Sequence, residues 1–128
     1  MSVTVSLTGS IKATDSVAGT IALSKVLTAL STPATNFSEA SGATVGVAPT
    51  ALTLPVSPTT FVYIKNTHAT QTLQVTWTPN GGASNIVVTL QPGSFIAFGE
   101  AVLGLSGITA LTVVGSGAST SYEFVLAG

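Results

Sequence analysis

The sequence predicts an all-β fold, an antiparallel β-sandwich of about eight short strands in a jelly-roll-like arrangement. Two observations lead to this prediction. Short runs of Val, Ile, Phe, Tyr and Thr recur along the 128 residues, and β-branched and aromatic residues favour strands. Clusters of Gly, Pro, Asn and Ser separate these runs at nearly regular intervals, as turns do in sandwiches and barrels.

The first predicted strand covers residues 2–8. Its apolar residues Val3, Val5 and Leu7 alternate strictly with Ser and Thr. Alternation with a period of two is typical of a strand with one buried face. Gly9 can bend the chain at this point, and residues 11–13 continue the same strand.

Residues 17–30 fit two different patterns. Residues 20–24 alternate as a strand does, whereas Leu23, Val26, Leu27 and Leu30 also fit the apolar stripe of a helix. We expect a strand near Ile21, followed by either a second strand or one short helix over residues 24–30.

The segment of residues 31–60 contains four prolines, Pro33, Pro49, Pro55 and Pro58. Proline cannot donate a hydrogen bond to a ladder, so these positions indicate edges and loops. Residues 44–47 and 51–54 are candidates for short edge strands. The segment is either a long surface connection or an arm that reaches a neighbouring subunit. We expect a single β domain over residues 1–128, with residues 1–13 and 31–60 as candidate intersubunit segments.

The second half of the chain carries the strongest strand and turn signals. Polar or glycine-containing turns are expected at residues 66–70, 79–82, 91–93 and 115–117. The strands between them are predicted at residues 61–64, 73–77, 86–90, 94–98, 108–114 and 122–126. The residues expected to form most of the core are Phe61, Tyr63, Leu73, Val75, Trp77, Ile86, Val88, Leu90, Phe95 and Val113.

The charge content is very low and excludes several functions. Only 5% of the residues are charged, whereas roughly 25% is usual. The charged residues are Lys12, Lys25, Lys65, Asp15, Glu39, Glu100 and Glu123, which give a net charge of −1. Nucleic acids and anionic membrane surfaces both require clusters of cations, so we expect neither partner. The absence of cysteine removes disulfides and cysteine-ligated zinc.

Neither a membrane helix nor a secretion signal is expected. No run approaches the ~18 consecutive apolar residues of a membrane helix. The first residues lack the basic and apolar regions of a signal peptide.

No residue pattern indicates catalysis, a metal or a cofactor, so we expect a protein that is not an enzyme. His68, the only histidine, lies in a predicted polar turn. Asp15 and a serine could in principle complete a triad with it, but the sequence contains no Gly-x-Ser-x-Gly motif. Glu39, Glu100 and Glu123 occur in different sequence contexts. Surface charges, or intersubunit partners of the lysines, are the roles we expect for these carboxylates.

The aromatic residues Tyr63, Trp77 and Tyr122 allow two interpretations. Exposed together, they would form a platform on which a sugar ring could stack. Trp77, however, is in phase with Leu73 and Val75, so we expect it in the core.

Four segments resemble small virion proteins of tailed bacteriophages. They are the strand and turn at residues 61–67, the strand at residues 73–77, the turn and aromatic strand at residues 90–98, and the tyrosine-bearing strand at residues 122–126. The resemblance covers residues 61–126 and implies a structural role without catalytic residues. It implies a capsid decoration (cement) protein in the virion, assembled in the host cytoplasm.

The implied partners are the major capsid protein, other virion subunits and copies of this chain. A tail or head-tail connector component is the nearest alternative. A carbohydrate-binding module on a host-recognition fibre is the alternative from another class, and it would require an exposed aromatic platform.

Overall fold

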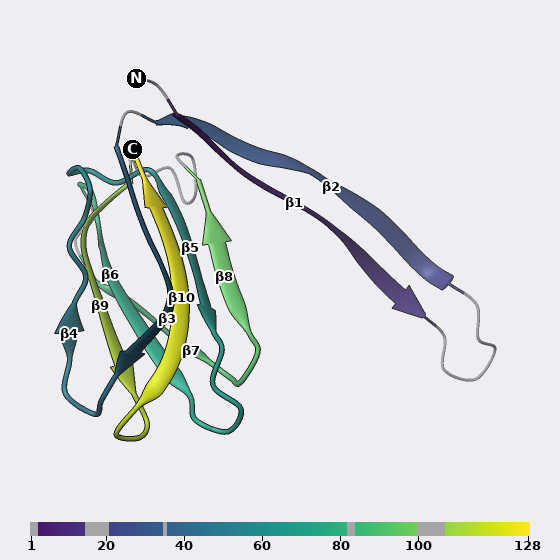
Figure 1. Cartoon of the computed structure of the whole chain (residues 1–128). Coiled ribbons are helices and arrows are strands. Elements are labelled where there is room, and N and C mark those ends of the chain that lie inside the picture. The colour runs from purple at the N-terminus through teal and green to yellow at the C-terminus, as the bar shows by residue number, and fades with distance from the viewer. Residues whose placement is uncertain (1–2, 15–20, 35, 82–83, 100–106) are drawn as a thin grey trace.

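The computed structural model describes residues 3–14, 21–34, 36–81, 84–99 and 107–128, with side chains described from residue 36 onward (Figure 1). All the regular elements in these ranges are strands. The strands are β1 (Val3–Thr14), β2 (Ile21–Ala34), β3 (Phe37–Val45), β4 (Thr50–Ala51), β5 (Phe61–Asn66), β6 (Leu73–Pro79), β7 (Ile86–Leu90), β8 (Phe95–Phe98), β9 (Ile108–Gly115) and β10 (Thr120–Ala127).

Strands β3 to β10 form two antiparallel sheets that pack face to face (Figure 1). One sheet has the order β3-β10-β5-β8 and the other the order β4-β9-β6-β7. The pairs β3/β10, β4/β9, β5/β8 and β6/β7 are all hydrogen-bonded neighbours. The first of these eight strands pairs with the last, the second with the second-last, and so on inward. Successive pairs alternate between the two sheets, which is the arrangement of an eight-stranded jelly roll. The predicted all-β sandwich is therefore confirmed.

The core lies between the two sheets and follows the alternation of the strands. In β6, Leu73, Val75 and Trp77 are buried, whereas Gln74 is exposed. Fully burying one such apolar side chain contributes about 1.5–3 kcal/mol. The other buried members of this core are Val45, Val62, Ile64, Leu90, Ile108, Leu111, Val113, Tyr122 and Leu126.

Most of the predicted core residues are buried, but Tyr63 and Phe95 are errors. Tyr63 is half-buried and packs against the separate cluster of Phe61 and Ala127 rather than the main core, because Val62 and Ile64 of the same strand face inward. The Phe95 side chain is 54% exposed, and Ile96 and Phe98 of the same strand pack against the core instead. The strand itself was predicted correctly, but its two faces were exchanged. Ile86 and Val88 are half-buried and pack against the core. Phe61 is buried in a separate small cluster with Ala127.

Strands β1 and β2 form a two-stranded antiparallel sheet of their own. We call this hairpin, from Val3 to Ala34, the arm. Figure 1 shows the arm extending away from the two sheets of the sandwich. Its register changes between Leu7 and Gly9, where the sequence suggested a bend. Residues 11–13 continue the strand, as predicted.

For residues 24–30 the strand alternative holds and the helix alternative fails, and the expectation for residues 31–60 was wrong. Residues 24–30 belong to β2, so the helix alternative fails, because pairing with β1 fixes an extended backbone. Residues 31–60 are not one long connection: β2 continues to Ala34, and Phe37–Val45 forms the nine-residue strand β3. Within this segment only the two-residue strand β4, at Thr50–Ala51, matches the expected short edge strands. Pro33 lies in an edge strand, where proline is tolerated.

A single β-bridge joins the segment before β5 to the first residue of β9. Thr59 pairs with Ile108 through two backbone hydrogen bonds, of 2.9 and 2.8 Å. Gly107 precedes this bridge with a φ of +87°, and a Cβ atom at this position would meet the carbonyl oxygen of Thr59. Only glycine combines this backbone conformation with so close an approach.

Candidate functional site

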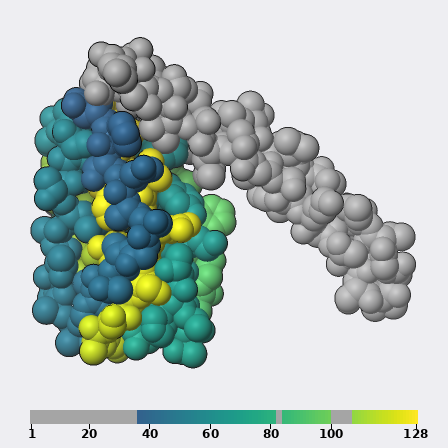
Figure 2. All heavy atoms as spheres, in the orientation of Figure 1, coloured from purple at the N-terminus to yellow at the C-terminus, as the bar shows by residue number. Residues whose placement is uncertain are grey.

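The outward-facing side of the β3-β10-β5-β8 sheet carries the most unusual surface of the sandwich. In the strand register, Val125 of β10 lies opposite Glu39 of β3 and Tyr63 of β5. The next outward row places Glu123 opposite Lys65. We call this surface, which also includes Phe37, Phe61, Phe95, Ala97 and Ala127, the outer face. Figure 2 shows it with atoms of β10 lying between those of β3 and β5.

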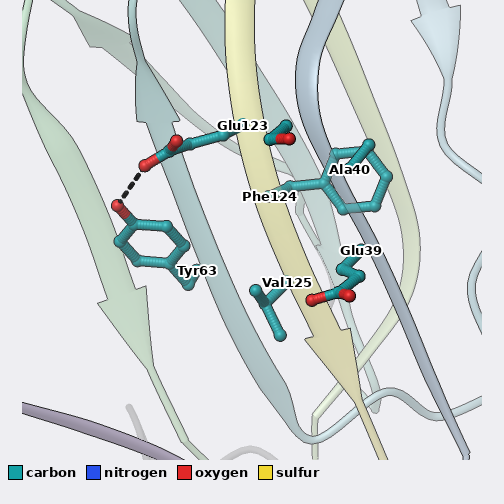
Figure 3. A pocket seen from close by; sticks show the side chains of 7 residues that line it. Glu39, Ala40, Tyr63, Glu123, Phe124 and Val125 are labelled. Atoms are coloured by element: carbon teal, nitrogen blue, oxygen red, sulfur yellow. Dashed lines mark hydrogen bonds between the residues drawn. The ribbon is translucent and has the colours of Figure 1, made fainter.

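A depression of about 490 Å³ lies in the outer face. The residues that line it are Glu39, Ala40, Ser41, Tyr63, Glu123, Phe124 and Val125. Figure 3 shows Tyr63 and Glu123 on one side of strand β10, and Phe124 and Glu39 on the other. The Tyr63 hydroxyl donates a hydrogen bond of 2.8 Å to Oε1 of Glu123.

A bulge in β3 shapes one wall of this depression. The register between β3 and β10 shifts between Tyr122 and Phe124, so β3 contains one extra residue there. Gly42, at this shift, has a φ of +73°, the left-handed conformation that glycine supplies in a common type of bulge. The neighbouring Ser41 and Ala40 line the depression. The Phe124 ring stacks on Tyr122, with ring centroids 6.1 Å apart.

The electrostatics of the depression favour binding rather than proton transfer. Burial, the hydrogen bond to Glu123 and the negative charge of Glu123 together raise the pKa of Tyr63 to about 12. Tyr63 therefore remains protonated and a donor near neutral pH, so it cannot act as a base. The two carboxylates, with Tyr63 beside Glu123, accept hydrogen bonds and attract cations. The arrangement can hold an ammonium group or a set of hydroxyl groups.

Apolar side chains surround this acidic area. Phe37 and Phe95 belong to the outer face and are 51% and 54% exposed. The Phe95 ring lies 6.1 Å from that of Tyr63, measured between centroids. Phe61 and Ala127 are buried there, with Tyr63 and Val125 packed against them. Phe37 and Phe95 lie on the two edge strands of this sheet, β3 and β8, so each is a separate exposed apolar side chain.

The structure brings together two carboxylates that the sequence appeared to separate. Glu39 and Glu123 occur in different sequence contexts, yet both line the depression. The register between β3 and β10 creates this proximity. The alternation of Glu123 with Tyr122 and Phe124 does predict an outward face for Glu123. Strand β3, which carries Glu39, was not predicted. Asp15 and Glu100 lie outside the described residues.

His68 lies in a turn, as predicted, and stabilises that turn. Its Nδ1 atom accepts hydrogen bonds from the backbone N–H groups of Thr70 and Gln71, at 3.1 and 2.9 Å. This ring nitrogen therefore serves as an acceptor for the backbone of the turn. His68 is half-buried rather than fully solvated.

The turn is anchored by Asn66, a residue that sequence reasoning did not single out. Asn66 is fully buried. Its Nδ2 donates to the carbonyl oxygens of Gln71 and Leu90, and its Oδ1 accepts from the N–H of His68. The buried amide therefore joins the end of β5 to the loop that follows it and to the end of β7.

Trp77 does not form a sugar-stacking platform. Its side chain is only 9% exposed, and its ring packs against Phe98 with centroids 5.3 Å apart. The prediction that Trp77 belongs to the core is confirmed. Tyr122 is buried as well, and Tyr63 alone of the three aromatic residues reaches the outer face.

Two other features are absent from the described ranges. Nowhere in those ranges do three or more His, Asp or Glu residues gather as metal ligands would. None of their elements is a helix of the length and apolarity needed to cross a membrane.

Comparisons with known proteins give little information about function. No protein-family model and no curated protein matches the sequence. Among solved structures, a chain from Bacillus endospore appendages, described as disulfide-linked pili, is similar with a TM-score of 0.48 and 13% sequence identity. The match covers 71% of this chain and 85% of that chain.

Proposed function

We propose that this chain is a non-enzymatic structural subunit of a tailed-bacteriophage virion. In this role it decorates the head, binding the major capsid protein and copies of itself. The observation that carries the proposal is the arm, a two-stranded sheet that pairs with neither sheet of the sandwich. The resemblance of residues 61–126 to small virion proteins supports the same role.

The physical reason lies in the marginal stability of isolated hairpins. A two-stranded sheet alone is at best marginally stable in water and requires a third strand or a packing surface. The arm strands contain 12 and 14 residues, which at about 3.3 Å per residue gives a length of roughly 40 Å. Both outer edges of the arm lack a third strand within the described residues. Contact with another subunit would supply the missing surface.

The composition suits permanent burial in an assembly. Burying charged groups carries a large desolvation cost, whereas this chain has only seven charged residues. A net charge near zero also promotes association between copies. Symmetric assemblies then multiply a modest interface many times.

The test combines light scattering with capsid binding. The intact chain should form multimers at micromolar concentration and sediment with phage heads assembled without it. A variant consisting of residues 36–128, which retains both sheets of the sandwich, should be monomeric and bind heads more weakly. Isolated phage tails serve as the matched comparison, since binding to tails alone would indicate a tail or connector component. An intact chain that remains monomeric and binds neither particle would contradict the proposal.

The outer-face depression favours a second candidate, a carbohydrate-binding module on a host-recognition fibre. Tyr63 and two carboxylates are groups that can recognise sugar hydroxyls. Binding to a glycan array that is abolished by Glu39→Ala would support this function. The same result would count against capsid decoration if head binding were absent.

A further inference from the structure

Strand β7, at Ile86–Leu90, is an edge of the sandwich with an open side. It stands at the end of the β4-β9-β6-β7 sheet and, among the described strands, pairs with β6 alone. Apart from that pairing and the bond from the Asn66 amide to the Leu90 carbonyl, no hydrogen bond within the described residues involves β7. The backbone groups along such an edge are a template on which another strand can pair.

The other three edges of the two sheets each have a feature that discourages pairing. Strand β3 carries the exposed Glu39 and the bulge at Gly42. Strands β4 and β8 contain only two and four residues. Charges, bulges and shortness are devices by which proteins block pairing between edges. Strand β7 has five residues, Ile-Val-Val-Thr-Leu, without a charge, a proline or a register shift, so none of these devices protects it.

The side chains of β7 would also gain from a neighbouring strand. Val87 points away from the core and is 54% exposed, and Thr89 is exposed on the same side. Ile86 and Val88 pack against the core but remain half-buried. A strand laid along this edge would remove apolar surface on both faces from water, which is favourable.

The sequence of β7 identifies a second copy of the same strand as the partner. An antiparallel pair centred on Val88 places Val88 opposite itself, Val87 opposite Thr89, and Ile86 opposite Leu90 of the second copy. Opposite residues lie on the same face of a sheet, so the inward-facing residues of both copies form one apolar layer. A two-fold axis brings identical side chains together, and facing like charges are destabilising. Because β7 carries no charge, it can pair with itself.

The backbone hydrogen-bonding groups fit the same axis. In an antiparallel ladder, alternate residues exchange hydrogen bonds with one neighbouring strand, and the remaining residues can bond to the other. The residues of β7 that face away from β6 are therefore either 87 and 89 or 86, 88 and 90. Both sets are symmetric about Val88, so the open groups of one copy meet those of the other.

We propose that two copies of this chain pair antiparallel through β7, about a two-fold axis at Val88, and so join two four-stranded sheets. This inference rests on the proposed function, because it names a surface through which copies of a self-assembling subunit meet. Five residues from each copy bury much less than the roughly 800 Å² per partner of a stable interface. The pairing therefore acts in multimers that the arm already holds together, where the local concentration of copies is high.

Two single-cysteine variants of the full-length chain test both the partner and the register. The chain has no cysteine of its own, and Val87 and Thr89 are exposed, so Val87→Cys and Thr89→Cys leave the core intact. In the proposed pair, residue 87 of one copy lies opposite residue 89 of the other at a Cα distance of about 4.5–5.5 Å, which a disulfide can span. Two copies of residue 87 lie roughly 7–8 Å apart on the diagonal, at or beyond the ~7 Å limit of a disulfide.

An equal mixture of the two variants should therefore form disulfide-linked dimers on mild oxidation about fivefold faster than either variant alone. The samples are oxidised at a concentration at which the wild-type chain is multimeric. Each variant is the control for the other, because both thiols lie on the same side of the same strand and collide equally often by chance. A mixture that cross-links no faster than the separate variants would overturn the proposal.

A charge on the edge provides a second test. Val87→Lys places two ammonium groups near the two-fold axis, so dissociation of the multimers should begin at about tenfold higher concentration of chain. Val47→Lys is the matched control, because Val47 is 67% exposed in the loop between β3 and β4, away from this edge. It should shift that concentration by less than about twofold. Equal shifts for the two variants would count against pairing through β7.

The outcomes separate this inference from the function on which it rests. Multimers that bind phage heads but show no preference for the mixed thiols would overturn the β7 pairing and leave the proposed function intact. Fast cross-linking of the mixture in a chain that binds no phage heads would support the pairing and contradict head decoration. A wild-type chain that remains monomeric at all concentrations would overturn both proposals.

Discussion

Replacing Asn66 with alanine should destabilise the sandwich by roughly 3–5 kcal/mol. The substitution removes three side-chain hydrogen bonds, of 2.8 Å to Gln71, 3.0 Å to Leu90 and 3.0 Å from His68. Each contributes about 0.5–1.5 kcal/mol net, and a buried group left without a partner costs a further 1–3 kcal/mol. The Leu90 carbonyl bonds to Asn66 in a buried environment, so water cannot readily replace the lost donor.

Urea unfolding followed by the fluorescence of Trp77, the only tryptophan, measures this change. The urea concentration at the midpoint of unfolding should fall, while the slope of the unfolding free energy against urea concentration stays constant. Gln74→Ala is the matched control, because Gln74 is also an amide but is exposed on β6. It should change stability by less than about 0.5 kcal/mol. A loss below about 1 kcal/mol for Asn66→Ala would refute the assignment of Asn66 as the anchor of these loops.

Two further predictions concern titration and backbone strain. In a Tyr122→Phe background, Tyr63 is the only tyrosine and should ionise with a pKa of about 12, followed by the absorbance of tyrosinate. Because the folded pKa lies above the ordinary value of 10.0, the associated stability is complete below pH 10 and is lost as pH rises towards 12. Glu123→Gln should lower this pKa only in part, since burial is the largest cause. A Tyr63 pKa near 10 in the protein that retains Glu123 would contradict the assignment. Gly93→Ala and Gly107→Ala both place alanine at a positive φ, costing roughly 1–2 kcal/mol. Only Gly107 faces a backbone carbonyl at close range, so its variant should lose at least about 1 kcal/mol more in urea unfolding; equal losses would show that the contact relaxes.

Local turn chemistry explains why the second half of the fold was predictable. The turn at residues 91–93 combines a proline with a glycine, and the structure has Gly93 at a φ of +79°. The Ser94 N–H donates to the Gln91 carbonyl oxygen at 2.9 Å across this turn. Strand β7, at Ile86–Leu90, has the predicted bounds. These signals lie within a few residues of one another, so they can be recognised from the sequence alone.

Features that depend on partners distant in the sequence were not predictable. The helical stripe of Leu23, Val26, Leu27 and Leu30 is a true pattern, but the pairing of β2 with β1 overrides it. Phe95 was assigned to the wrong face because Phe95, Ile96 and Phe98 are all apolar, so alternation could not identify the inner side. Strand β3 is rich in Ser and Ala, and its bulge at Gly42 interrupts the alternation.

The candidate site was missed for the same reason. Its acids come from strands β3 and β10, and only their register brings Glu39 into line with Val125, two residues from Glu123. The sequence did suggest that carboxylates could serve as intersubunit partners of Lys12, Lys25 or Lys65. The structure adds that two of these carboxylates share one depression.

The proposed arm contact also constrains the kind of particle that can form. An arm that docks on a different surface of the next copy makes a heterologous interface, and repeated heterologous contacts close into a ring or continue as a filament. A decoration protein at a capsid symmetry axis requires the closed form, whereas a tail component can use the open form. With so few charges to fix the docked position, the angle between arm and sandwich becomes the main determinant of closure. Sequence changes at the end of β2, which is Ala34, or at the start of β3, which is Phe37, should therefore convert one form of assembly into the other.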